Sequence, residues 1–149
     1  MKLTSDAFEN NSIIPKQYGY NHGNISPPLT IQDVPDETKS LVLIMDDPDA
    51  IKAVGKVWVH WILWNIPPQT KIIKENSLPK KSNQGVNDFG EVGYGGPAPP
   101  DGEHCYVFRL YALNKIISLK DGSSIKELKR EISSNIIEQC IIIGKYAPQ

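Results

Sequence analysis

Features that would assign a function by themselves are scarce in this sequence. It has only two cysteines, Cys105 and Cys140, and no C-x-x-C motif, which argues against a disulfide framework or a zinc site. A single bridge between the two is one interpretation, and two reduced thiols in a cytoplasmic protein is the simpler one. The formal net charge is -1 at pH 7, so the chain lacks the basic excess typical of nucleic-acid binding.

Long apolar runs are missing as well. Runs such as residues 141–143 fall far short of the about 20 apolar residues that span a bilayer. Residues 1–6 lead directly into polar sequence, without the apolar stretch of a signal peptide. We therefore expect no membrane span. The 149 residues, of which 40% are hydrophobic and 22% charged, suffice for one globular domain over residues 1–149.

Strand patterns dominate what is present. Apolar runs predict long strands at residues 41–45, 57–66 and 106–113 and a final strand at 141–146. Residues 1–40 contain shorter apolar pieces separated by Asn, Pro and Gly turns, which predict short strands. The sequence therefore indicates a mostly β fold.

One helix is predicted, over residues 123–138. Ile and Leu recur there at three- and four-residue spacing. Ser124 and Glu127 have the spacing of a capping box, in which each side chain bonds the backbone amide of the other residue. The chain is thus expected to be mostly β with one late helix.

Ionisable side chains stand at the ends of the apolar strands. Asp47 follows the run at residues 41–45, and His60 and His104 lie in or beside the two other long runs. Burying such groups without a partner costs several kcal/mol, so a function is one explanation for them. Each also has a purely structural explanation, because Asp-Pro forms turns and histidine beside aromatic residues is often a core residue.

Strand alternation groups these residues by face. Because side chains alternate, we expect Trp58 and His60 to share one face with Ile62 and Trp64. His104 and Tyr106 lie together by the same rule, and Cys105 lies opposite to them. Asp47 continues the face of Leu41, Leu43 and Met45.

A glycine- and proline-rich loop occupies residues 94–102. Gly95 and Gly96 would let backbone amides approach a ligand and form a concave anion-binding nest. Pro97 and the prolines after it would hold such a loop rigid. The loop could equally be an idle surface segment, and its glycines alone are a weak signal.

The order of these motifs is a stronger signal. Asp-Pro-Asp-Ala at residues 47–50 is followed by Trp-x-His at 58–60, Tyr-Gly-Gly-Pro-Ala-Pro-Pro at 94–100 and Gly-x-His-x-Tyr at 102–106. This order resembles the phosphatidylethanolamine-binding protein family, and the chain is similar to its bacterial and archaeal members more than to the mammalian Raf kinase inhibitor protein. The resemblance implies a large antiparallel sheet packed on a smaller one, with helical elements at the C-terminus.

The resemblance also implies a small pocket, open to the surface, that binds anions such as the phosphate of phosphoethanolamine. Its residues would be Asp47, Trp58, His60, Gly95, Gly96, Pro97, His104 and Tyr106. Protonated histidines would donate to phosphate oxygens. Asp47 would either orient a histidine and keep it charged, or accept a hydrogen bond from a monoprotonated phosphate or an ammonium group. Binding should then weaken as the histidines lose protons. We also predict a cis Asp47–Pro48 bond at the pocket edge.

The sequence departs from the family pattern at two places. Cys105 stands where the family usually has Arg after the histidine, and Arg109, two strand steps further on the same face, could partly substitute for it. Ile51-Lys52 replaces the usual Pro-Ser or Pro-Thr after the Asp-Pro-Asp-Ala motif. We expect the rim of the pocket and its ligand preference to differ accordingly.

The leading functional prediction is a small binding protein in the cytoplasm, for an anionic or phosphorylated ligand, with no chemical step and no cofactor. An interaction module that inhibits a kinase or protease is the alternative that the resemblance suggests, as is a homodimer. A hydrolase with His60 or His104 as base and Asp47 as orienter is less favoured, since no motif supplies a nucleophilic Ser. The spacing of these three residues is not diagnostic of a metal site.

Overall fold

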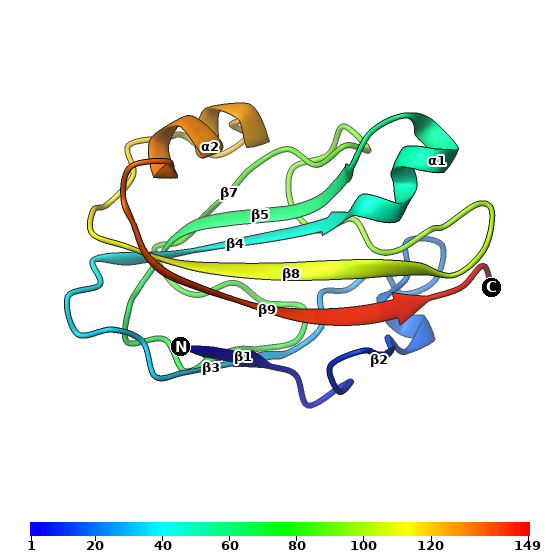
Figure 1. Ribbon diagram of the computed structural model, residues 1–149, viewed down its shortest axis with the longest axis horizontal. Helices are drawn as coiled ribbons and strands as arrows, with labels where there is room; N and C mark the ends of the chain where they lie inside the picture. The colour runs from blue at the N-terminus through cyan, green and yellow to red at the C-terminus, as the bar shows by residue number, and fades with distance from the viewer.

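The computed structural model describes all of residues 1–149 and consists of two β-sheets packed face to face (Figure 1). The larger sheet has six strands in the order β2-β9-β8-β4-β5-β7. Their bounds are β2 Ser12–Ile13, β4 Ser40–Asp47, β5 Trp58–Ile66, β7 Asn83–Gln84, β8 His104–Leu113 and β9 Ile136–Tyr146. The smaller sheet has the order β1-β3-β6, with β1 Lys2–Thr4, β3 Leu29–Gln32 and β6 Ile72–Ile73. The mostly β fold is confirmed, although β2 pairs with β9 in parallel rather than antiparallel.

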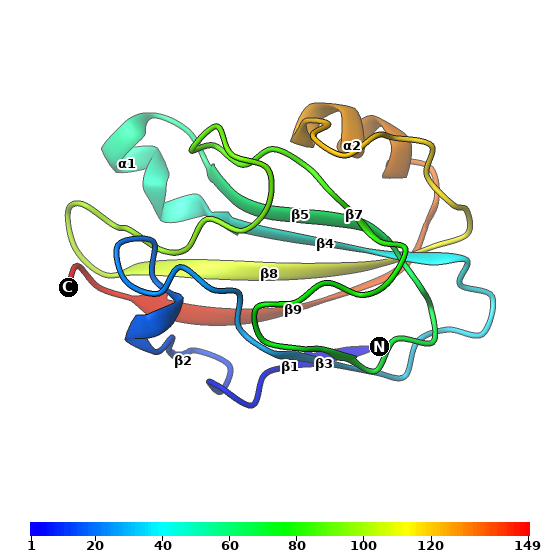
Figure 2. The ribbon, with the colours of Figure 1, turned by 180° about the vertical axis from the view of Figure 1, so that it is seen from behind.

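Two hydrophobic cores lie on opposite faces of the larger sheet. The main core fills the space between the sheets, where Leu43 and Phe108 of the larger sheet meet Leu29 and Ile73 of the smaller one. Seen from behind, the N-terminal segments and the chain after β5 lie over this face (Figure 2). Burial of these side chains stabilises the fold by roughly 1.5–3 kcal/mol for each.

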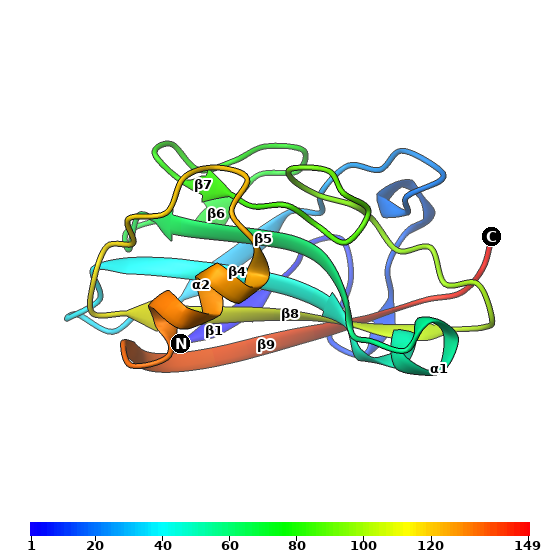
Figure 3. The same ribbon diagram turned by 90° about the horizontal axis from the view of Figure 1, so that it is seen from above.

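The second core lies beneath the helix α2 (Ile125–Ile132), which packs Leu128 and Ile132 against Ile62 and Trp64 of β5. A short helix, α1 (Ile51–Val54), lies at the opposite end of the large sheet (Figure 3). Two single-turn 3-10 segments complete the fold, η1 at Lys16–Tyr18 and η2 at Pro48–Ala50. None of the helices combines the length and apolar character that a membrane crossing needs.

The predicted helix is present, but its predicted C-terminal end is wrong. Ser124 caps α2 through the complete capping box with Glu127. The helix ends at Ile132, and β9 begins at Ile136 rather than at residue 141. Ile136 pairs with Leu113 of β8, so β-branched residues that extend the helical spacing belong to a strand instead.

The predicted alternation along β5 is interrupted by a β-bulge. Met45 pairs with Trp61, whereas the next residue, Asp46, pairs with Val59, which leaves His60 as the extra residue of β5. Ile62 and Trp64 consequently face the core beneath α2, while Trp61 faces the core between the sheets. The prediction that His60 shares a face with Ile62 and Trp64 is therefore wrong.

The turn after β4 also differs from its prediction. The chain contains no cis peptide bond, so Asp47–Pro48 is trans. Pro48 opens the 3-10 turn η2, a position where its fixed φ and missing amide suit a helical start. The turn continues into α1, which ends at Gly55 with a φ of 81°, the left-handed conformation that glycine adopts readily.

Candidate functional site

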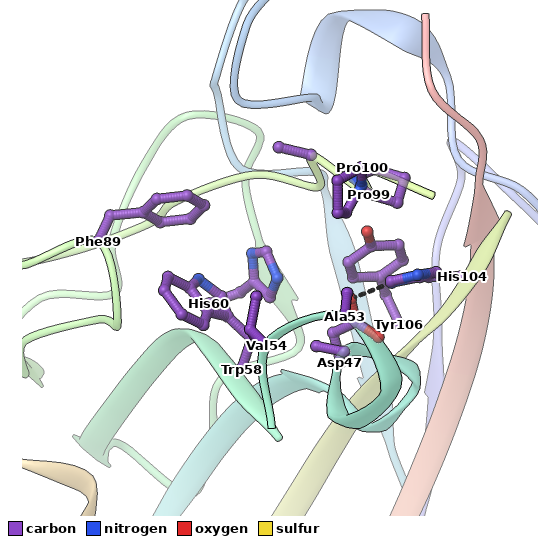
Figure 4. A pocket seen from close by; sticks show the side chains of 12 residues that line it. Asp47, Ala53, Val54, Trp58, His60, Phe89, Pro99, Pro100, His104 and Tyr106 are labelled. Atoms are coloured by element: carbon purple, nitrogen blue, oxygen red, sulfur yellow. Dashed lines mark hydrogen bonds and ion pairs between the residues drawn. The ribbon is translucent and has the colours of Figure 1, made fainter. Parts of the chain in front are cut away.

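A cavity of about 130 Å³ lies at one end of the central strands of the large sheet, where β4 ends and β5 and β8 begin (Figure 4). Its lining is formed by Asp47, Ala50, Ala53, Val54, Trp58, His60, Phe89, Ala98, Pro99, Pro100, His104 and Tyr106. Strands β4, β5 and β8 therefore supply its polar groups, and the segments after β4 and before β8 supply most of its apolar wall.

The bulge in β5 places Trp58 and His60 together at the cavity. Asp88 supports this distorted strand start, since its carboxylate accepts the backbone N–H of Val59 at 2.6 Å. Asp88 also pairs with Lys56 at 3.0 Å. Phe89 then contacts both rings edge-on, with centroid distances of 5.5 Å to Trp58 and 5.6 Å to His60. The loop after β7 thus fixes the orientation of two pocket side chains.

His60 is a neutral member of the site. Its side chain is almost fully buried, and this burial lowers its pKa to about 4. Its Nδ1 lies 2.6 Å from the carbonyl oxygen of Gly95. Because that oxygen can only accept, Nδ1 carries the proton and Nε2 is an acceptor.

His104 is held between two carboxylates. Its Nδ1 lies 2.6 Å from Asp47 Oδ2, and its Nε2 lies 2.6 Å from Asp101 Oδ1. Burial lowers the pKa of His104, but hydrogen bonds and charge from Asp47 and Asp101 outweigh this effect and leave the pKa raised. The site therefore combines one neutral histidine with one that favours its charged form.

Polar atoms without a partner gather at this cavity. The chain has five buried side-chain polar atoms that lack a hydrogen-bond partner, and three of them belong to cavity-lining residues: Asp47 Oδ1, Trp58 Nε1 and the Tyr106 hydroxyl. Such atoms are rare in folded proteins because each one costs stability. Burial raises the pKa of the Tyr106 hydroxyl, and the negative charge of Asp47 raises it further. The hydroxyl therefore remains a proton donor.

The turn between β4 and α1 is tied to β8. The carboxylate of Asp49 accepts the backbone N–H of Cys105 at 2.8 Å. This bond holds Ala50, Ala53 and Val54 against the mouth of the cavity. The Asp-Pro-Asp motif thus has two separate roles, because Asp47 faces the cavity and Asp49 secures the wall.

Comparison with known proteins agrees with this architecture. The family model described as phosphatidylethanolamine-binding protein matches residues 4–147. The chain belongs to the phosphatidylethanolamine-binding protein family. A UPF0098 protein of Methanothermobacter thermautotrophicus is 44% identical to it, with 98% of each chain covered.

Solved structures of the phosphatidylethanolamine-binding protein family share the fold. A homologue from Chlamydia trachomatis has a TM-score of 0.92 at 39% identity, covering 99% of this chain and 97% of its own. Escherichia coli YbcL, described as a new member of the mammalian family, has a TM-score of 0.92 at 31% identity, covering 99% of this chain and 98% of its own. Proteins of this family are generally binding proteins.

Five of the eight predicted pocket residues line the cavity of this family member, namely Asp47, Trp58, His60, His104 and Tyr106. The other three, Gly95, Gly96 and Pro97, do not line the cavity and make backbone hydrogen bonds to neighbouring segments. The Gly95 amide donates to the His60 carbonyl at 2.9 Å, and the Pro97 carbonyl accepts from the Tyr20 amide at 2.9 Å.

The Gly96 amide donates to Asn24 Oδ1 at 2.8 Å. A Cβ atom at Gly96 would lie 2.1 Å from the Tyr18 carbonyl oxygen, so glycine is required there for close backbone packing. The amides of Gly95 and Gly96 are therefore bonded inside the protein and are not free to bind an anion in this structure.

Arg109 does not replace the arginine that the family usually has at position 105. Its guanidinium pairs with Asp46 at 3.1 and 3.2 Å, and it is not among the residues that line the cavity. Position 105 itself also lies outside the cavity lining. The pocket thus contains no guanidinium from this chain.

Two functional candidates escaped sequence reasoning. Phe89 follows a polar turn and belongs to no motif, so only the folded structure brings it to Trp58 and His60. Asp101 lies in the loop at residues 94–102, and its carboxylate bonds His104. Its i,i+3 spacing from His104 was the one signal available.

Proposed function

We propose that the cavity binds the phosphate-bearing part of a small molecule, such as a phosphoethanolamine-like headgroup or a phosphorylated metabolite, without a chemical step. The observation that carries this proposal is the gathering of unpartnered polar atoms at one cavity: Asp47 Oδ1, Trp58 Nε1 and the Tyr106 hydroxyl. A phosphate group can satisfy all three, because its oxygens accept from the two donors and a P–OH group donates to the carboxylate.

The charges favour a phosphate group that carries one proton. The carboxylate of Asp47 would repel a dianion, whereas a monoprotonated phosphate presents the donor that Asp47 Oδ1 lacks. The imidazolium of His104, 2.6 Å from both Asp47 and Asp101, offsets one of the two negative charges that flank it. Because the second pKa of a phosphate monoester is about 6, binding should weaken from mildly acidic to alkaline pH.

The two histidines of the site have different charge states and therefore different roles. With its pKa lowered to about 4 by burial, His60 contributes no positive charge near pH 7, and its Nε2 is a second acceptor for a ligand proton. His104 is then the positive group of the site, where the sequence had predicted two charged histidines.

The absence of a chemical step is supported by the poor nucleophiles near the cavity. The Tyr106 hydroxyl has its pKa raised by burial, and burial also raises the pKa of the Cys105 thiol, as does the charge of Asp49. Neither group is set up to attack a phosphate or carbonyl. Inhibition of a kinase or protease by docking stays a prediction of the family resemblance alone.

The test is calorimetric titration of inorganic phosphate and phosphoethanolamine at pH 5.5 and 7.5. In Tyr106→Phe, we expect affinity to fall about tenfold or more, since a hydrogen bond to a charged group contributes about 1.5–3 kcal/mol. Tyr111→Phe is the matched control, because it removes a hydroxyl from the same strand β8 at a residue outside the cavity. Lack of saturable binding to the unmodified protein at both pH values would contradict the proposal.

A further inference from the structure

Asp101 bonds a pocket residue without belonging to the pocket. Its carboxylate contacts His104 Nε2, yet Asp101 is not among the residues that line the cavity. The Asp101 side chain is 48% exposed, whereas those of His104 and Asp47 are 5% and 4% exposed. The three residues form a line of hydrogen bonds that runs from solvent through the imidazole to the cavity.

Burial raises the pKa of Asp47, and both contacts in this line require a donor on the imidazole when the two carboxylates are ionised. A carboxylate oxygen lies 2.6 Å from each ring nitrogen of His104, and an ionised carboxylate can only accept. The geometry therefore matches a doubly protonated ring that donates from both nitrogens. With Asp47 Oδ2 engaged by Nδ1, the second oxygen of that carboxylate, Oδ1, is the one left without a partner.

We infer that Asp101 is a positioning residue of the pocket, which acts through His104 to keep Asp47 ionised and oriented with Oδ1 available to a ligand proton. The inference rests on the proposed function for the nature of the ligand, but not for the state of His104. The pocket would then favour a ligand that donates a proton, because the line of hydrogen bonds presents an acceptor to the cavity and keeps the imidazolium behind it.

Further titratable groups lie near His104, but only Asp47 and Asp101 bond its ring. The Asp49 carboxylate, from the turn after β4, is used by the amide of Cys105. From β9, Tyr146 is paired with His104 in register and Lys145 with Cys105. His60 faces the site from β5, and Glu103 precedes His104 on the exposed chain. Asp47 and Asp101 alone make hydrogen bonds to the imidazole.

The state of His104 can be followed directly without any ligand. The chain has only three histidines, so proton NMR can follow the titration of His104 in the unmodified protein and in Asp101→Asn. We expect its midpoint to shift to lower pH in the variant, because one of the two acceptors loses its charge. Glu103→Gln is the matched control, since it removes one negative charge from the residue next to His104 without removing a hydrogen bond to its ring. Asp101→Glu keeps a carboxylate at this position, so its His104 midpoint should lie close to that of the unmodified protein.

Phosphate binding then tests the link to the pocket. With inorganic phosphate as the probe, the ratio of Kd at pH 7.5 to Kd at pH 5.5 should rise about three- to tenfold in Asp101→Asn relative to the unmodified protein, since an altered pKa changes the charged fraction tenfold per pH unit. The ratio should not change in Glu103→Gln. The titration of phosphate itself is common to all variants and cancels from the comparison.

Two results would overturn the inference. One is a His104 midpoint in Asp101→Asn equal to that of the unmodified protein, and the other is an equal shift in Glu103→Gln. Failure of the unmodified protein to bind phosphate would instead count against the proposed function, while the ligand-free titration would still decide whether Asp101 controls His104.

Discussion

Tyr106 shows how a single residue can serve the site at the expense of the fold. Its side chain is fully buried in β8, and its hydroxyl has no partner in the chain. A buried hydroxyl in this state costs stability, because it has lost its bonds to water without replacement. The ring contributes to packing, whereas the hydroxyl makes no hydrogen bond of normal geometry to the protein.

Replacing Tyr106 with phenylalanine should therefore leave the protein equally stable or stabilise it by up to about 1 kcal/mol. The measurement is the free energy of unfolding in urea without ligand. A destabilisation of more than about 1 kcal/mol would mean that the hydroxyl bonds to another group of the protein, and it would weaken the assignment of this residue to ligand binding.

The residues that could be predicted from sequence were those with unusual chemistry in a strand. Asp47, His60 and His104 stand out because ionisable groups interrupt apolar runs, and each lines the cavity. Phe89 could not be found in this way, since an aromatic residue in a loop has many ordinary explanations. Its role depends on where the loop after β7 crosses the sheet, which is set by tertiary packing.

At the scale of elements, the β-bulge is the feature that alternation rules could not supply. The sequence of β5 is apolar on both faces, and nothing in it marks His60 as the extra residue opposite β4. The bulge depends on pairing between strands, which one strand's sequence does not encode. Because of the bulge, His60 lines the cavity while the next residue, Trp61, packs in the main core.

The start of α2 was predictable, because a capping box is a local signal. Ser124→Ala should destabilise the protein by about 1 kcal/mol, since the Glu127 amide loses its acceptor. Urea unfolding is the measurement. Ser133→Ala, at the other end of α2, is the control and should change stability by less than about 0.5 kcal/mol, because its hydroxyl only donates to a carbonyl at an exposed position. Equal losses in both variants would contradict the role of the cap.

The end of α2 was not predictable from spacing. Isoleucines at three- and four-residue intervals suit a helix face, but Ile136 lies in β9 because strand β8 offers it a pairing partner. Long-range pairing thus decided between two local possibilities.

At the scale of the whole molecule, the two pocket histidines make stability depend on pH in opposite directions. His104 has a raised pKa, so the stability that its charged form contributes is fully present below its unfolded-state pKa of about 6.5 and is lost as pH rises through its folded-state pKa. His60 has a lowered pKa of about 4. Its neutral form is favoured by folding, and the unfolded chain takes up a proton first as pH falls below about 6.5.

The contribution of His60 predicts a measurable loss of stability in acid. Between pH 7 and pH 4, the free energy of unfolding should fall by about 3 kcal/mol more in the unmodified protein than in His60→Gln. Urea unfolding at the two pH values gives this difference, and comparing the two proteins cancels the titration of groups that they share. An identical pH dependence would show that His60 is not held neutral in the folded state.

The placement of β9 between β2 and β8 has a consequence for how quickly the chain can fold. The β2–β9 edge brings together residues such as Asn10 and Ile143, which are 133 positions apart and joined by a hydrogen bond. The entropy lost in closing so long a loop must be overcome before the pairing can stabilise the chain. Folds rich in such distant contacts reach the native state in milliseconds to seconds rather than microseconds. β2 pairs with β9 only at Gly144 and Lys145, so most of this side of β9 has no strand partner. Association with other chains can compete with folding there.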